Sequence, residues 1–160
     1  MLLALVIAAR AEGEWKTVDL GFVLSVPPDW EQVKERGIDS YVGRLKSKDA
    51  ELTFDEAGSF MYSAGEARLA VANLKRKARN PKLLKVGEEI WIVDGRVADF
   101  SIRKPDFAYG VPPFTNVATL FVPYKGSGGS LSIAIFYRSK DGELTARRIL
   151  QSVVWKKAPK

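Results

Sequence analysis

The chain has 160 residues, of which 46% are hydrophobic and 28% charged, and its formal net charge is +6. This composition indicates a folded protein rather than a disordered one, and the length suits one domain. The sequence has no cysteine and no histidine, which excludes disulfides, zinc–thiolate sites, cysteine nucleophiles and histidine-dependent triads. Because reactive side chains are scarce, we expect a protein that is not an enzyme and has no cofactor.

The first residues have the pattern of a secretory signal. An unbroken apolar run at 2–9 leads into the small-x-small triplet Ala9-Arg10-Ala11, although no Lys or Arg precedes the run. The run is too short to span a bilayer as a helix. We therefore expect a signal peptide at 1–11, one domain at 12–155 and a loose basic tail at 156–160. The mature chain would be periplasmic or extracellular without a transmembrane segment, and cytoplasmic if the signal is not real.

The first half of the chain predicts paired strands. Strands are expected at 15–20 and 22–26, and Pro27-Pro28 ends the second because proline cannot donate to a β-ladder. Asp29 is expected to cap a short helix that runs to Arg36. A hairpin follows, with strands at 41–46 and 51–56. Its register pairs Gly43 with Phe54, so that the phenyl ring covers the bare backbone at the glycine.

The second half predicts two helices and two more hairpins. A capping box from Ser63 to Glu66 begins a helix that ends at Asn80-Pro81. The turn Asp94-Gly95 joins strands at 89–93 and 96–102, and a second hairpin has strands at 115–122 and 131–137. Asp141 is expected to cap the last helix. The apolar stripe of that helix comprises Ala146, Ile149, Leu150, Val153 and Val154. Hairpins with two separate helices predict an α+β fold with an antiparallel sheet.

Three segments, in their order along the chain, resemble the PsbP-like family. They are residues 22–30 (FVLSVPPDW), 93–98 (VDGRVA) and 149–155 (ILQSVVW). That family includes the extrinsic subunit of the photosynthetic oxygen-evolving complex, a nuclear-import factor that binds the GTPase Ran, and many small exported bacterial proteins. The resemblance implies an antiparallel sheet flanked by helices, as an α/β/α sandwich, and an accessory or binding role in a bacterial exported protein.

Two surfaces are candidates for binding. The long connection 103–114 combines aromatic and cationic side chains, which suits contact with a protein partner or a small ligand. Its candidate residues are Phe107, Tyr109, Phe114, Arg103 and Lys104. The second is a basic helix face that could bind anionic lipid or a polyanion, or simply be a solvated surface. Its residues are Arg68, Lys75, Arg76 and Arg79. Nucleic acid is disfavoured as a partner of an exported protein.

An enzymatic alternative rests on two acids. The expected strand register places Asp39 with Glu56 on one face, which could support metal-assisted hydrolysis, whereas Asp55 would lie with Arg44. The ordinary role of such acids is in salt bridges or turn caps, and no calcium-loop pattern is present. The glycine-rich segment 125–130 lacks a P-loop ending and predicts a hairpin tip. The leading hypothesis is an exported, non-enzymatic binding or accessory domain.

Overall fold

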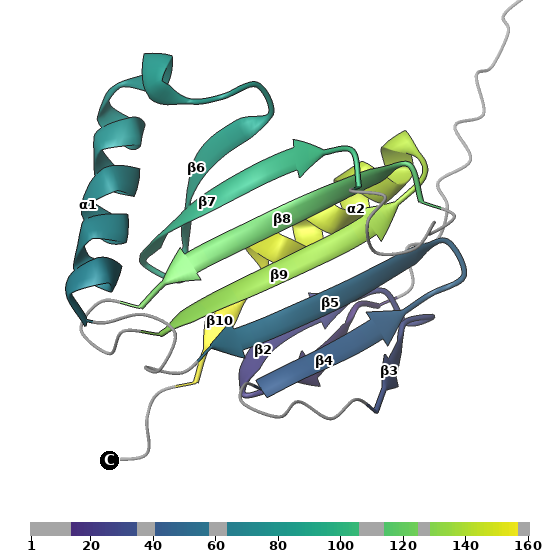
Figure 1. Cartoon of the computed structure of the whole chain (residues 1–160). Coiled ribbons are helices and arrows are strands. Elements are labelled where there is room, and N and C mark those ends of the chain that lie inside the picture. Colours follow the sequence, from purple (N-terminus) through teal and green to yellow (C-terminus); the bar gives the residue numbers. More distant parts are fainter. Residues whose placement is uncertain (1–13, 35–40, 58–63, 106–113, 125–128, 157–160) are drawn as a thin grey trace, which may run out of the picture.

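The computed structural model describes residues 14–34, 41–57, 64–105, 114–124 and 129–156. Within these residues, antiparallel strands form a sheet of three and a sheet of seven, accompanied by two α-helices (Figure 1). This arrangement confirms the predicted α+β class. The predicted signal at 1–11 and most of the glycine-rich segment 125–130 lie outside the described residues.

The larger sheet has the strand order β3-β4-β5-β9-β8-β7-β6, and the smaller one the order β1-β2-β10. The strands of the larger sheet are β3 (Glu31–Val33), β4 (Tyr41–Lys46), β5 (Ala50–Ala57), β6 (Glu88–Val93), β7 (Arg96–Arg103), β8 (Asn116–Pro123) and β9 (Ser130–Tyr137). Those of the smaller sheet are β1 (Lys16–Asp19), β2 (Phe22–Val26) and β10 (Val154–Trp155). The helices are α1 (Ala64–Arg79), the short 3-10 helix η1 (Pro81–Leu83) and α2 (Lys140–Gln151).

The hydrophobic core lies between one face of the larger sheet and a layer made of α2 and the smaller sheet. Alternate side chains of β2 and β9 point into it, as a strand period of two requires. The buried residues include Phe22, Leu24, Val26, Leu131, Ile133, Ile135 and Tyr137 from these strands, with Ala146, Ile149 and Leu150 from α2. Figure 1 shows α2 behind the larger sheet and α1 beside its β6–β7 edge. No described helix is both long and apolar enough to cross a membrane.

The two helices contact opposite faces of the larger sheet. On α1, Lys77 forms an ion pair with Glu88, at 3.0 Å between its Nζ and the carboxylate. On α2, Arg147 forms an ion pair with the next residue of β6, Glu89, at 2.9 Å. Because successive side chains of a strand point to opposite faces, the helices flank the sheet from both sides.

Two predicted hairpins are confirmed in their register. β4 pairs with β5 so that Lys46 lies opposite Glu51 and Gly43 opposite Phe54. A Cβ atom added to Gly43 would lie 2.4 Å from Cε1 of Phe54, so the ring does cover this glycine. At the β6–β7 turn, Asp94 and Gly95 have φ values of 46° and 74°, which a two-residue turn of type I′ requires.

The predicted helix from Asp29 to Arg36 is wrong over its described part. Residues 31–33 form strand β3, which pairs with β4. The backbone N–H of Trp30 donates to the Pro27 carbonyl at 3.2 Å, and the Trp30 side chain is only 2% exposed. This turn buries the indole and directs the chain into the sheet edge, where ladder hydrogen bonds replace those of a helix.

The limits predicted for the last helix are also corrected. The N-cap is Ser139, whose Oγ accepts a hydrogen bond from the backbone of Gly142, and Asp141 lies in the first turn instead. The helix ends at Gln151, because the backbone N–H of Ser25 donates to the Ser152 hydroxyl at 2.9 Å and holds that residue against β2. Val154 is therefore not helical and pairs with β2 as part of β10.

Candidate functional site

The structure describes three of the five candidate residues of the 103–114 connection, since Phe107 and Tyr109 lie outside the described residues. The Nζ of Lys104 donates to the Asn116 side chain at 3.1 Å. The ring of Phe114 is 6.2 Å from that of Phe136 and 5.5 Å from the Arg138 guanidinium. Arg103 borders a 540 Å³ depression on the larger sheet. Lys104 and Phe114 are thus engaged within the chain.

The proposed acid pair cannot be assembled from the described residues, because Asp39 lies outside them. Its intended partner Glu56 accepts a hydrogen bond from the Tyr124 hydroxyl at 2.8 Å. Asp55 and Arg44 share a face, as the register predicted. No group of three or more acidic residues in the described part of the chain is placed to hold a metal ion.

The basic segment around α1 does not form one uniform surface. Lys77 lies against the sheet, 3.0 Å from Glu88 and 3.8 Å from Asp99. Arg68, Arg76 and Arg79 are exposed. Lys75 is also exposed, but it lines a cavity between α1 and the larger sheet. The four residues of the predicted basic face are therefore all exposed, and one of them, Lys75, also forms a cavity wall, whereas the neighbouring Lys77 belongs to a structural ion pair.

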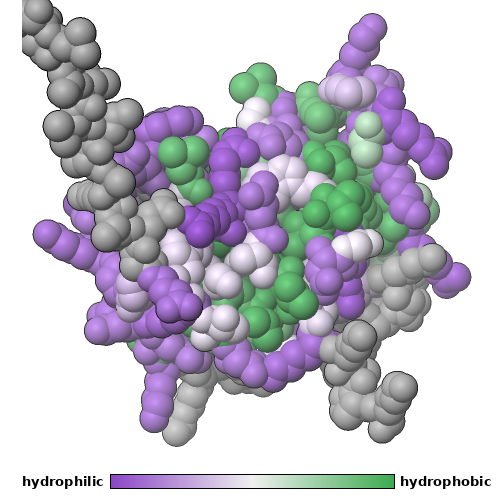
Figure 2. Space-filling view, turned by 180° about the vertical axis from the view of Figure 1, so that it is seen from behind, coloured by the Kyte–Doolittle hydropathy of each residue, from purple (hydrophilic) through white to green (hydrophobic). Residues whose placement is uncertain are grey.

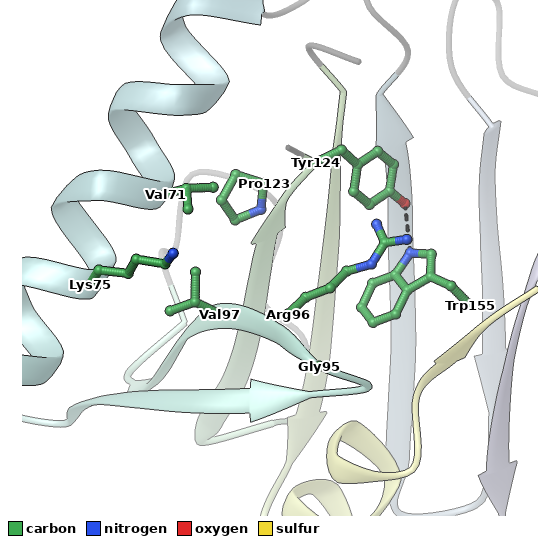
Figure 3. Close-up of a pocket in the computed structure, with 8 residues that line it drawn as sticks. All are labelled: Val71, Lys75, Gly95, Arg96, Val97, Pro123, Tyr124 and Trp155. Atoms are coloured by element: carbon green, nitrogen blue, oxygen red, sulfur yellow. Dashed lines mark hydrogen bonds between the residues drawn. The ribbon is translucent and has the colours of Figure 1, made fainter. Parts of the chain in front are cut away.

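This cavity, which we call the Arg96 cavity, has a volume of about 570 Å³. It lies where α1, the β6–β7 turn, the end of β8 and β10 meet (Figure 3). It is lined by Val71, Lys75, Gly95, Arg96, Val97, Pro123, Tyr124 and Trp155. Its size falls within the range of pockets that take small organic molecules.

Arg96 is held against two aromatic rings that also line the Arg96 cavity. Its guanidinium carbon is 4.4 Å from the Trp155 ring centre and 5.1 Å from that of Tyr124. The two rings meet edge to face at an interplanar angle of 87°. Figure 3 shows Arg96 between these rings, with Lys75 reaching in from α1 on the other side. Stacking on the rings restrains the guanidinium without using all of its N–H donors.

Hydrogen bonds fix the two rings in place. The Trp155 indole donates to the Tyr124 hydroxyl at 3.1 Å, and that hydroxyl donates in turn to Glu56. The backbone N–H of Trp155 donates to the Asp94 carboxylate at 2.8 Å. Burial raises the pKa of Tyr124, and the nearby Glu56 carboxylate raises it further, against the lowering effect of the Trp155 hydrogen bond. The phenol therefore stays protonated at neutral pH and remains a hydrogen-bond donor.

The charge of the Arg96 cavity is not balanced by ion pairs within the described structure. Neither Lys75 nor Arg96 has a carboxylate partner among the residues described, whereas Lys77 and Arg147 each contact two acids. The nearby Glu56 and Asp94 are engaged by Tyr124 and by the Trp155 backbone. Two cations, two aromatic rings and an apolar floor can together hold a flat organic anion.

The sequence did not reveal this site because its walls come from four distant segments. Each segment has an ordinary local explanation: residues 71–75 belong to a helix, 95–97 to a hairpin, and 123–124 to the end of a strand. Trp155 comes directly after Val154, the last residue of the apolar stripe predicted for the final helix. The nearest signal was the Asp94-Gly95 turn, which places Arg96 at the start of a strand.

Comparison with known proteins supports the fold only. No protein-family model matches the chain, and no curated protein matches it in sequence. A crystal structure from Bacteroides thetaiotaomicron VPI-5482 is similar, with a TM-score of 0.57 and 10% sequence identity. The match covers 91% of this chain and 49% of the other, so this chain spans about half the length of that protein.

Proposed function

We propose that the protein is a non-enzymatic binding domain whose Arg96 cavity takes a small organic anion with a flat apolar part. The observation that carries the proposal is that Arg96 and Lys75 line one cavity without a carboxylate partner among the described residues. A carboxylate or sulfonate group of a ligand would balance the positive charge of these two side chains. The Tyr124 and Trp155 rings would contact the apolar part of the ligand. Charge-assisted hydrogen bonds to a guanidinium are among the stronger polar contacts in proteins.

The stacked position of Arg96 favours binding for a second reason. An arginine that must be ordered by its ligand loses side-chain freedom on binding, and this loss opposes association. Here the guanidinium is already held 4.4 Å from the Trp155 ring centre. The entropic cost of ordering the Arg96 side chain is therefore largely met during folding. More of the energy of its contact with a ligand then contributes to affinity.

This proposal keeps the binding role expected from the sequence and changes its location. Within the 103–114 connection, Lys104 and Phe114 contact their own chain, whereas the Arg96 cavity offers unpaired charge within the described structure. Export and the relationship to the PsbP-like family stay predictions. An accessory role in an exported bacterial protein is compatible with capture of a small anion.

The test compares naphthoate with its uncharged amide, naphthamide, by isothermal titration calorimetry on the full chain. We expect naphthoate to bind about tenfold or more tightly than naphthamide, which corresponds to about 1.4 kcal/mol. Arg96→Gln should remove most of this preference, and Lys75→Gln part of it. Arg79→Gln is the matched control, because Arg79 is exposed on α1 and does not line the cavity. Equal binding of both compounds, or unchanged naphthoate binding by Arg96→Gln, would refute the proposal.

A further inference from the structure

A second surface lies where α1 ends and the chain turns through η1 into β6. We call residues 76–86 the Lys82 corner. In Figure 1 it stands at the top of α1, beyond the adjoining end of the larger sheet. In Figure 2, which views the molecule from behind, hydrophilic side chains project from this corner at the upper right, with apolar atoms between them.

The Lys82 corner carries a concentrated positive charge. The segment 76–86 contains five cationic residues and no acid. Lys77 is the one that turns inward, where it meets Glu88 and Asp99. The exposed ones are Arg76, Arg79, Lys82 and Lys85. Arg79 and Lys82 have no ion pair among the described residues, so their charge faces solvent.

Exposed apolar side chains alternate with these cations. Val86 is fully exposed at 103%, and Leu83 is 41% exposed. Leu69, at 71% exposed, lies two helical turns before Arg76 and therefore on the same outward side of α1. Single exposed apolar residues are ordinary on protein surfaces. Apolar side chains set among lysines and arginines, with no acid between, are instead the pattern of surfaces that lie on a lipid headgroup layer.

We propose that the Lys82 corner docks the protein onto an anionic membrane surface. The cations would meet lipid phosphates, while Val86 and Leu83 would enter the boundary between headgroups and acyl chains. The apolar residues favour a membrane over a soluble polyanion, because a polyanion offers charge but no apolar phase. The proposal does not depend on the Arg96 cavity, since Lys75 is not part of the corner.

The test is co-sedimentation of the full chain with vesicles of phosphatidylglycerol and phosphatidylcholine, and with vesicles of phosphatidylcholine alone. Binding is expected only to the anionic vesicles, and it should weaken as salt is added. The double variant Arg79→Gln/Lys82→Gln should bind about 25-fold more weakly, since each basic residue near an anionic surface contributes about fivefold. Val86→Ser should weaken binding about threefold or more, because it removes an apolar group from the interface.

The matched control is Lys46→Gln/Lys48→Gln, which removes the same charge from exposed positions at the β4–β5 turn. This control should bind vesicles within about twofold of the wild type, because the proposal attributes binding to the charges of the Lys82 corner and not to the net charge of the protein. No binding to anionic vesicles, or an equal loss in the control, would overturn the proposal. If Val86→Ser binds vesicles as well as the wild type and the wild type also binds heparin tightly, the membrane proposal is overturned in favour of a soluble polyanion. Circular dichroism verifies that each variant is folded.

Discussion

Among the arginines that lie against aromatic rings, Arg147 and Arg96 differ in one respect. Arg147 on α2 is 4.6 Å from the Phe100 ring centre and contacts the carboxylates of Glu89 and Glu143 at 2.9 and 3.2 Å. Arg96 at the β6–β7 turn is 4.4 Å from the Trp155 ring centre and has no carboxylate partner among the described residues. The first arginine is paired within the fold, and the second is the one for which we propose a ligand.

The Arg147 cluster joins α2 to the edge of the larger sheet. Glu89 accepts two hydrogen bonds from the guanidinium and a third, at 2.8 Å, from the Trp91 indole. The Trp91 ring stacks on Phe100 with 3.9 Å between ring centres. The Arg147 hydrogen bond lowers the pKa of Glu89, against the raising effect of burial. Every charged group in this cluster has its partner within the fold.

The largest effect on stability is expected from Arg147→Ala. The substitution removes two charge-assisted hydrogen bonds to Glu89 and the packing on Phe100, so we expect unfolding to require about 2–3 kcal/mol less. Urea denaturation followed by far-ultraviolet circular dichroism measures this change. Arg79→Ala is the control and should change stability by less than about 0.5 kcal/mol, because Arg79 is exposed on the surface. A loss equal to that of the control would show that the Arg147 cluster is not structural.

A smaller effect on folding stability is expected when the pH is lowered. Because the Glu89 pKa in the folded state lies below its usual 4.5, the stabilisation is present above that pH and is lost as pH falls through the folded-state pKa. Arg147→Ala should therefore lose less stability than the wild type between about pH 5 and pH 3. The measurement is the urea midpoint of both proteins across this range. Parallel pH profiles would contradict the assignment, since Glu89 and Glu143 are the two described carboxylates whose pKa is lowered by a hydrogen bond from Arg147, which the variant removes.

The smallest effect on stability is expected from Arg96→Gln. This change removes cation–π contacts at a half-buried position, so we expect a loss under about 1 kcal/mol. The same variant should lose most of its preference for naphthoate over naphthamide. Thermal unfolding and calorimetry on one preparation separate the two effects. If Arg96→Gln unfolds as easily as Arg147→Ala, the two arginines have the same role and the comparison fails.

The parts of the fold that could be predicted are those set by neighbouring residues. The Asp94-Gly95 turn requires positive φ at both positions, and Gly43 opposite Phe54 follows from counting residues across a four-residue loop. The three-stranded sheet could not be predicted in this way. β10 pairs with β2 although the two strands lie far apart in the sequence. Val154 of β10 also fits the helical spacing of apolar residues predicted for the last helix. A helical pattern and a short strand are indistinguishable over two residues.

The candidate site was less predictable than the fold. Lys75 was correctly assigned to a basic helix, but nothing local distinguishes it from Arg79, which does not line the cavity. The difference depends on where α1 lies relative to β8 and β10, which is a matter of tertiary packing. The hypotheses on Asp39, Phe107 and Tyr109 concern residues outside the described part of the chain, so they stay predictions.

The pairing of β10 with β2 has a consequence for the order of assembly. Trp155 lies opposite Phe22 in the smaller sheet and also forms a wall of the Arg96 cavity. During synthesis, this sheet is complete only after residues 154–155 have left the ribosome and paired with β2. Until then the Arg96 cavity lacks its Trp155 wall, so closing this wall is coupled to completing the smaller sheet.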